Sequence, residues 1–234
     1  MRAMPESILA LIPAHDEAPR IAPVVTEAAR VLPVLVVDDG SSDETARVAR
    51  EAGAEVLVQT PNQGKGAALR AGMRRALAEG RDAVVTLDAD GQHDPAELDA
   101  FLAARAATGA DLIVGRRDFG RMPPARRLAN TLGGLALSRA VGRAVPDNQS
   151  GYRLIGRPLM ERIVESREGG FEFEVEMIAV AIRLGMRIEW VPIRTIYTGG
   201  PSHVRPLAHL RHFIRIVRSA RRIVRSGDRR SPDR

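Results

Sequence analysis

The sequence predicts an α/β domain in which a mostly parallel sheet is flanked by helices. Short runs rich in β-branched and other apolar residues alternate with longer segments of helical period over most of the 234 residues. The chain is 44% hydrophobic, which is enough for a substantial core and excludes disorder as a state of the whole chain. Cysteine is absent, so disulfides, thiolate metal sites and cysteine nucleophiles are excluded, and a reducing compartment suits the chain.

The elements follow one another in a regular order. Ser42 or Asp43 is placed to cap the second helix, and Pro95 stands where the first turn of the fourth helix tolerates proline. No internal repeat or low-complexity linker interrupts the pattern before Ser226. We expect strands at 8–13, 34–38, 55–59, 83–87, 111–115 and 187–192, and helices at 18–31, 43–52, 65–78, 95–106, 124–141, 157–165, 173–184 and 206–225.

The excess of positive charge lies at the C-terminus. The net charge is +6, but residues 1–201 contain 25 basic and 27 acidic side chains, whereas residues 202–234 contain 10 basic and 2 acidic ones. We expect a domain over 1–204, a basic amphipathic helix over 205–226 and a disordered tail over 227–234. Two sets of side chains recur at helical spacing in that segment: apolar Leu207, Leu210, Ile214, Val217 and Val224, and basic Arg211, Arg215, Arg218, Arg222 and Arg225.

Two interpretations of this helix stay open. It binds an anionic membrane surface, or it packs on the domain and leaves its arginines in solvent. Nucleic-acid binding is disfavoured because aromatic residues make up only 3% of the chain and leave almost no surface for base stacking. The longest apolar runs, near 8–12 and 31–37, are far shorter than the ~18 residues that a membrane span needs. We therefore expect no transmembrane segment and no signal peptide, and a cytoplasmic protein, which is peripheral at the inner face of the cell membrane if the first interpretation of the helix holds.

Polar residues follow five successive predicted strands. In open α/β sheets, ligands bind outside the carboxyl ends of the strands. Any one of these segments alone suits ordinary turn chemistry, but five together predict a binding site. The segments are 13–17, 38–42, 61–66, 88–94 and 115–120.

The segment after the fourth strand has the composition of a metal site. Asp88 and Asp90 are two residues apart, Gln92 adds a neutral oxygen and His93 adds a nitrogen. Mg²⁺ and Mn²⁺ prefer oxygen ligands, commonly one or two carboxylates together with substrate phosphates. A solvated aspartate-rich turn that caps the next helix is the alternative.

Asp38 and Asp39 end a buried strand, where carboxylates accept hydrogen bonds from a ribose hydroxyl or a base N–H. A turn that leads into a capped helix is the alternative. No Gly-x-Gly-x-x-Gly follows the first strand, which disfavours a nicotinamide cofactor. Lys65 is the only lysine of the chain and stands between two glycines, so its compact ammonium is a candidate ligand for the substrate.

Two later segments add charged candidates. Arg116, Arg117, Arg126 and Arg127 flank a loop and suit phosphate oxygens, or else form a solvated surface. Segment 170–176 places Glu172, Glu174 and Glu176 at the start of a helix. These carboxylates either stabilise the helix N-terminus or supply a general base.

Taken in order, the segments 12–17, 36–45, 62–68, 88–95, 115–117, 147–153 and 170–176 resemble the motifs of inverting family 2 glycosyltransferases. The resemblance is strongest to the dolichyl-phosphate mannosyltransferase-like and polyprenyl-phosphate branch and covers roughly residues 8–204. It implies the GT-A fold, a Rossmann-like fold that binds nucleotide diphosphate sugars. Two departures accompany it: Glu172 stands where some relatives have lysine, and the C-terminal membrane spans of many relatives are missing.

The resemblance also implies roles for individual residues. The diphosphate and its Mg²⁺ or Mn²⁺ are expected on Asp88, Asp90 and Gln92, with Asp90 also catalytic. The residues expected to bind the nucleotide sugar are Pro13, Ala14, Glu17, Asp38, Asp39, Lys65, Asp88, Ala89 and Arg117.

From these roles we expect transfer of a hexose from a nucleotide diphosphate sugar, of the GDP-mannose or UDP-glucose type, to an isoprenoid lipid phosphate. A hydroxyl acceptor would need a general base, for which the candidates are Asp147, Glu172 and Glu174. The alternatives are the same donor chemistry with a soluble hydroxyl acceptor, and a non-catalytic nucleotide-sugar-binding protein.

Overall fold

The computed structural model describes residues 6–118, 120, 124–165, 172–194 and 206–227. The elements along the chain are β1 (Ile8–Ala14), α1 (Ile21–Ala28), β2 (Val34–Asp39), α2 (Thr45–Glu51), β3 (Glu55–Gln59), α3 (Lys65–Ala78), β4 (Ala83–Thr86), the 3₁₀ turn η1 (Pro95–Glu97), α4 (Leu98–Thr108), β5 (Leu112–Arg117), α5 (Pro124–Val141), β6 (Arg153–Gly156), α6 (Arg157–Ile163), α7 (Glu172–Arg183), β7 (Ile188–Ile193) and α8 (Pro206–Gly227).

The strands form one seven-stranded sheet in the order β3-β2-β1-β4-β6-β5-β7. All the pairs are parallel except the two made by β6, which runs antiparallel to both β4 and β5. The predicted α/β class and the six predicted strands are confirmed. Strand β6 was not predicted, because it has only four residues, begins with the charged Arg153 and leads directly into α6.

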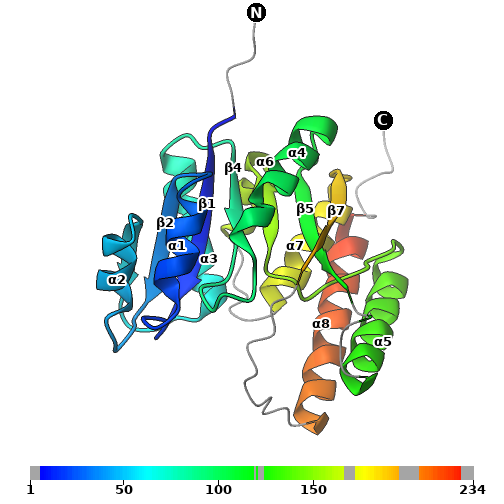
Figure 1. Cartoon of the computed structure of the whole chain (residues 1–234). Coiled ribbons are helices and arrows are strands. Elements are labelled where there is room, and N and C mark those ends of the chain that lie inside the picture. Colours follow the sequence, from blue (N-terminus) through cyan, green and yellow to red (C-terminus); the bar gives the residue numbers. More distant parts are fainter. Residues whose placement is uncertain (1–5, 119, 121–123, 166–171, 195–205, 228–234) are drawn as a thin grey trace, which may run out of the picture.

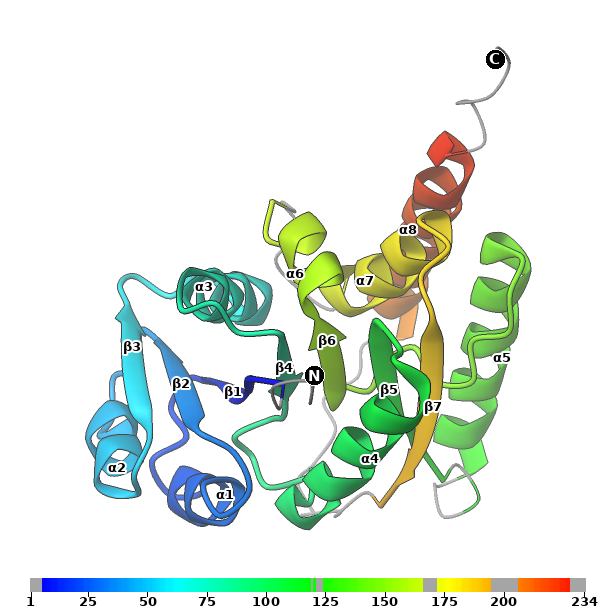
Figure 2. The same cartoon turned by 90° about the horizontal axis from the view of Figure 1, so that it is seen from above.

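Helices cover both faces of the sheet, as the view in Figure 2 shows. On one face α3, α5, α6, α7 and α8 enclose the first hydrophobic core, around Leu11, Met73 and Phe173. On the other face α1, α2 and α4 enclose the second core, around Ile12 and Phe101. The β1, β2 and β4 strands read as continuous apolar runs because the sheet is buried on both sides.

Helix α8 packs on α7 and α5 through a stripe that shares Val224 with the predicted one and otherwise differs from it in the described residues. Ile214, which was assigned to the apolar stripe, is 41% exposed. The side chains of Leu207, Leu210 and Arg211 lie outside the described residues, as do residues 228–234 of the predicted tail. The side chains that pack against the core are Ile216, Ala220, Ile223 and Val224.

This packing agrees with the second interpretation of the helix for the side chains that are described. The arginines at 215, 218, 221, 222 and 225 are exposed. No helix in the described part of the chain combines the length and the hydropathy that a bilayer span requires.

Candidate functional site

The candidate site lies at the carboxyl edge, which we define as the edge of the sheet where β1, β2, β3, β4 and β5 end. Because these strands are parallel to one another, the five polar segments that follow them meet at this edge, as predicted. Strand β6 runs in the opposite sense, so its first residue, Arg153, lies beside Thr86 near the end of β4. The segment that precedes β6 therefore also reaches the edge.

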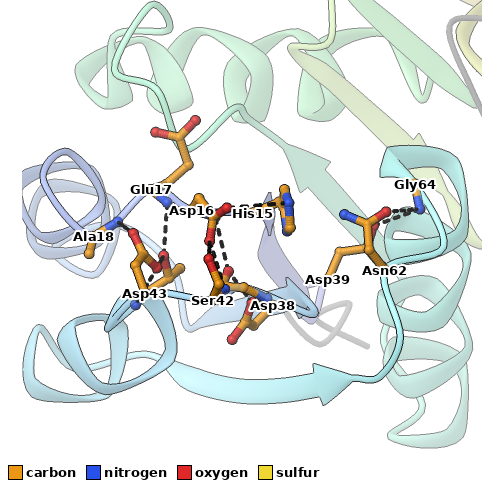
Figure 3. A network of polar contacts seen from close by, with 12 residues as sticks. His15, Asp16, Glu17, Ala18, Asp38, Asp39, Ser42, Asp43, Asn62 and Gly64 are labelled. Atoms are coloured by element: carbon orange, nitrogen blue, oxygen red, sulfur yellow. Dashed lines mark hydrogen bonds and ion pairs between the residues drawn. The ribbon is translucent and has the colours of Figure 1, made fainter.

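The loops after β1 and β2 are joined by hydrogen bonds (Figure 3). The backbone N–H of Ser42 donates to Asp16 Oδ1 at 2.7 Å, and the N–H of Asp16 donates to Ser41 Oγ at 3.0 Å. Asp38 accepts hydrogen bonds from the N–H and the hydroxyl of Ser41. Asp16 has a positive φ of 54°, a conformation that aspartate tolerates better than most residues. These contacts fix the loop around the buried Asp38.

A second set of bonds joins the start of α1 to the start of α2. The N–H of Glu17 donates to Thr45 Oγ1 at 2.8 Å, and the N–H of Ala18 donates to Asp43 Oδ2 at 3.1 Å. The Glu17 carboxylate accepts a hydrogen bond from Arg20 Nε at 2.6 Å. Pro13 and Ala14, at the end of β1, are buried beside this loop. The predicted nucleoside-binding residues of the first two strands thus lie together.

Asp39 holds the loop between β3 and α3. Its two carboxylate oxygens accept hydrogen bonds from the N–H groups of Gln63, at 2.9 Å, and Gly64, at 2.6 Å. Gly40 makes the close approach of the loops possible. A Cβ at Gly40 would lie 2.8 Å from the backbone nitrogen of Asn62, and its φ of +72° also favours glycine. Asp39 therefore positions the start of α3 and with it Lys65.

Lys65 connects two carboxylates that are far apart in the sequence. Its Nζ lies 2.6 Å from Asp88 Oδ1 and 3.3 Å from Glu174 Oε1. The Lys65 and Asp88 side chains are 33% and 28% exposed, whereas that of Glu174 is 3% exposed. Glu174 Oε1 has no partner with hydrogen-bond geometry, so its contact with the ammonium is electrostatic. Gly151 leaves room for this cluster, since a Cβ there would lie 2.9 Å from Lys65 Nζ.

The contacts within this cluster keep Lys65 and Asp88 charged. Burial disfavours the charged ammonium, but the carboxylates of Asp88 and Glu174 outweigh this effect and raise the pKa of Lys65 above its usual value. Burial acts in the same way on Asp88, and the neighbouring Lys65 ammonium outweighs it and lowers the pKa of that carboxyl. At neutral pH the site therefore contains the ion pair of Lys65 and Asp88.

Arg153 is fully buried below this cluster. Its guanidinium donates to the carbonyl oxygens of Ser150, at 2.8 Å, and Glu174, at 2.5 Å, and more distantly to that of Asn148, at 3.4 Å. Burial lowers the pKa of Arg153 to about 10, which leaves it charged at neutral pH. The guanidinium thus ties the segment before β6 to the start of α7. Arg153 belongs to segment 147–153, and no role was predicted for it.

Arg117 and Asp147 form a bidentate ion pair. Arg117 Nε donates to Asp147 Oδ2 at 2.7 Å, and its Nη2 donates to Oδ1 at 2.9 Å. Asp147 also accepts the N–H of Gln149 at 3.0 Å and is only 1% exposed. Such a pair has a fixed geometry. Asp147, predicted as a general base, therefore orients Arg117, which is the predicted phosphate ligand.

The loop after β4 brings Asp90 and Gln92 beside Asp88. Asp90 is half-buried and accepts the backbone N–H of Gln92 through Oδ1 at 2.9 Å, whereas the Gln92 side chain is exposed. Ala89, between the two aspartates, is 3% exposed and packs into the core, so only its backbone is available to a nucleotide.

His93 has a structural part in this loop. Its Nδ1 accepts the N–H of Asp88 at 3.0 Å, so the proton of the neutral ring is on Nε2. Burial lowers the pKa of His93 and keeps the ring neutral. Its ring centroid lies 5.1 Å from that of Tyr152.

The donor set fits a hard divalent cation that a substrate helps to bind. The described residues contain no group of three or more histidine, aspartate or glutamate side chains able to enclose a metal ion. Asp88, Asp90 and Gln92 supply only oxygen atoms, and Mg²⁺ and Mn²⁺ are commonly held by one or two carboxylates together with substrate phosphates.

The structure brings most of the predicted site residues to the carboxyl edge. The Glu172 side chain lies outside the described residues. The contacts made by Ser41, Thr45, Gly151 and Arg153 were not foreseen, because their partners are remote in the sequence. The only local feature of Arg153 in the sequence is its position directly before the apolar pair Leu154 and Ile155.

Three comparisons with known proteins agree with this architecture. The family model described as glycosyl transferase family 2 matches residues 10–164. The chain is 34% identical to an undecaprenyl-phosphate mannosyltransferase of Micrococcus luteus, over 80% of this chain and 82% of that protein. It is also 34% identical to a polyprenol monophosphomannose synthase of Mycolicibacterium smegmatis, over 79% of this chain and 76% of that protein.

Among solved structures, the fold is similar to that of glucosyl-3-phosphoglycerate synthase from Mycobacterium tuberculosis in complex with Mn²⁺ and UDP-glucose. The TM-score is 0.68 at 25% sequence identity, and the match covers 92% of this chain and 77% of that one. The similarity confirms the predicted GT-A fold.

Proposed function

Because the chain belongs to glycosyltransferase family 2, we propose that this glycosyltransferase moves a hexose, with inversion, from a nucleotide diphosphate sugar to an isoprenoid lipid phosphate. One observation carries the proposal: Asp88 and Asp90 lie together at the carboxyl edge of a chain that is 34% identical to an undecaprenyl-phosphate mannosyltransferase.

The donor is assigned to the loops after β1 and β2. The buried ends of these strands, Pro13 and Ala14 with Asp38 and Asp39, form a rigid floor for the nucleoside. Thr45 accepts the backbone N–H of Glu17, and Arg20 holds the Glu17 carboxylate beside this floor. GDP-mannose and UDP-glucose are the two donors to be tested.

The diphosphate would lie over the loop after β4. Asp88, Asp90 and Gln92 would hold Mg²⁺ or Mn²⁺, which would neutralise the negative charge that develops on the departing nucleoside diphosphate. Arg117 would contact the same phosphates from the end of β5, in the orientation that Asp147 imposes. Lys65 would hold Asp88 in place.

Two of the three candidate bases, those whose side chains are described, favour a phosphate acceptor. Asp147 is bonded to Arg117, Glu174 lies against Lys65, and both side chains are almost fully buried. Neither is placed to remove a proton from an incoming hydroxyl. A lipid phosphate is already anionic, so it attacks the anomeric carbon without such help.

A soluble hydroxyl acceptor is the second candidate. It is favoured by the structural similarity to glucosyl-3-phosphoglycerate synthase, whose name denotes a water-soluble product. The two candidates share the donor chemistry and differ in the phase in which the product is found.

The test is to incubate the protein with radiolabelled GDP-mannose or UDP-glucose and Mn²⁺, with either a polyprenyl phosphate in detergent or 3-phosphoglycerate as acceptor. We expect label in the organic phase for one donor, with loss of at least about 100-fold in Asp90→Ala. Isothermal titration should show weaker Mn²⁺-dependent nucleotide binding in the same variant. Asp99→Ala, which removes an exposed carboxylate from α4, is the control. Label confined to the aqueous phase would refute the lipid acceptor.

A further inference from the structure

Helices α5 and α8 form a strongly basic pair outside the carboxyl edge. They pack against each other and lie side by side in Figure 1. Together they contain nine arginines, no lysine and no acidic residue. The rest of the chain is therefore slightly acidic on balance, and this pair carries the positive charge.

Apolar side chains are exposed on the same pair. Leu132 and Leu135 are 57% and 59% exposed. They lie on one side of α5, because residues three apart in a helix are neighbours on its surface. Ile214 on the neighbouring α8 is 41% exposed. The other large apolar residues with comparable exposure in the described part of the chain, Val58 and Leu184, belong to neither helix. Apolar side chains that are exposed next to one another, rather than scattered singly, mark an interaction surface.

Four arginines in the second half of α8 are exposed. Arg218, Arg221, Arg222 and Arg225 are exposed, and none makes an ion pair with a described residue. The buried stripe of α8 faces α7 and α5, so it fixes these side chains on the outer surface. The apolar side of α8 is thus used for packing, and α5 supplies the exposed leucines.

We propose that the outer surface of α5 and α8 docks on an anionic phospholipid membrane, with Leu132 and Leu135 entering the interface and the α8 arginines contacting headgroup phosphates. Charge complementarity identifies the occupant: the two helices contain nine arginines and no carboxylate, seven of these arginines are described and exposed, and such a surface matches a phosphate-rich plane. Nucleic acid fits less well, since α5 contains no aromatic residue for base stacking. The proposal goes beyond the proposed function, because this surface lies apart from the donor site.

Co-sedimentation with vesicles tests the proposal without any turnover. The full chain is mixed with vesicles of phosphatidylcholine that contain 30% phosphatidylglycerol, or of phosphatidylcholine alone. We expect affinity at least about tenfold higher for the anionic vesicles and a decrease of that affinity with added salt. Leu132→Ser with Leu135→Ser, and separately Arg218→Gln with Arg222→Gln, should each weaken binding about tenfold.

Matched controls come from other surfaces. Leu184→Ser, and Arg30→Gln with Arg50→Gln, remove exposed side chains of the same kinds and should bind as wild type. Thermal melting of every variant shows whether it is folded, and transfer to a short, water-soluble polyprenyl phosphate should be unchanged in all of them. Equal pelleting of wild type and leucine variants would overturn the proposal. So would a dimer in solution that only the leucine variants dissociate, since the surface would then bind a second copy of the chain.

Discussion

Replacement of Lys65 by methionine tests the charge cluster most directly. Methionine has similar length and volume, so the change removes the ammonium without opening a large cavity. It leaves the Asp88 and Glu174 carboxylates close to a common point, with Glu174 only 3% exposed. Breaking a buried ion pair by removing one partner costs about 3–5 kcal/mol. Because Lys65 and Asp88 are about one third exposed, we expect a smaller loss of about 2–3 kcal/mol.

The assay is urea denaturation followed by circular dichroism, with thermal melting as a second measurement. For a domain of this size, a loss of 2–3 kcal/mol corresponds to a fall in Tm of roughly 4–12 °C. Arg75→Met is the matched control. Arg75 is on the same helix and pairs with Glu55, at 2.7 Å, and Glu79, at 2.5 Å, but its side chain is 50% exposed. Removal of such a surface pair should cost less than about 1 kcal/mol.

A double-mutant cycle separates charge from packing. In the Lys65→Met background, Glu174→Gln removes a buried charge that has lost its partner, so it should restore part of the lost stability. In the wild type the same substitution removes one contact of the ammonium and should destabilise. If Lys65→Met costs no more than Arg75→Met, and the two substitutions are additive, the cluster contributes nothing to stability and our reading of Lys65 is wrong.

Three further outcomes are expected. Gly151→Ala places a Cβ 2.9 Å from the cluster ammonium, so it should destabilise by about 1–3 kcal/mol and reduce donor binding, measured by urea denaturation and titration calorimetry. Gly134→Ala is its control, because the nearest atom to that Cβ is 3.4 Å away. Arg153→Met leaves three buried carbonyl oxygens without their donor and should cost about 3–5 kcal/mol in urea denaturation; a loss below 1 kcal/mol would contradict its structural role. Burial raises the pKa of Glu97 above its ordinary 4.5, so the folded state binds this proton more tightly than the unfolded state, and the stability from Glu97 declines as pH rises from about 4.5 through the raised pKa. Glu97→Gln should flatten the pH dependence of unfolding in that window, and an unchanged profile would refute the assignment.

Most of the sheet was predictable because its strands are buried on both faces. Such strands appear as continuous apolar runs, and the observed bounds of β1, β2 and β3 differ from the prediction by at most one residue. Strand β6 gave no such signal, since one of its four residues is a buried arginine and another is glycine. Arg153 can be buried because carbonyl oxygens outside β6 accept its hydrogen bonds. No local sequence pattern indicates that these oxygens are close.

The sequence predicted which residues lie at the site, but it did not predict which of them contact one another. Asp88 and Asp90 follow a strand, so their place at the carboxyl edge follows from the α/β class alone. That Lys65 contacts Asp88 and Glu174 depends on how α3 and α7 approach the sheet, and positions 65, 88 and 174 share no local pattern. The apolar stripe of α8 was predicted correctly at Val224 and wrongly at Ile214 for a related reason: both sides of the helix offer apolar residues, and the packing on α7 and α5 selects one of them.

The side-chain hydrogen bonds that hold the loops after β1, β2 and β3 have an evolutionary consequence. Among the described residues, these bonds join positions between 16 and 64. The loop after β4 differs, because Lys65 joins Asp88 to Glu174 of α7. Mutations outside Glu174 and the segment before β6 can therefore accumulate in the second half of the chain without disturbing the first three loops. A lineage with this fold can vary much of α6 to α8 while the proposed nucleoside site stays intact.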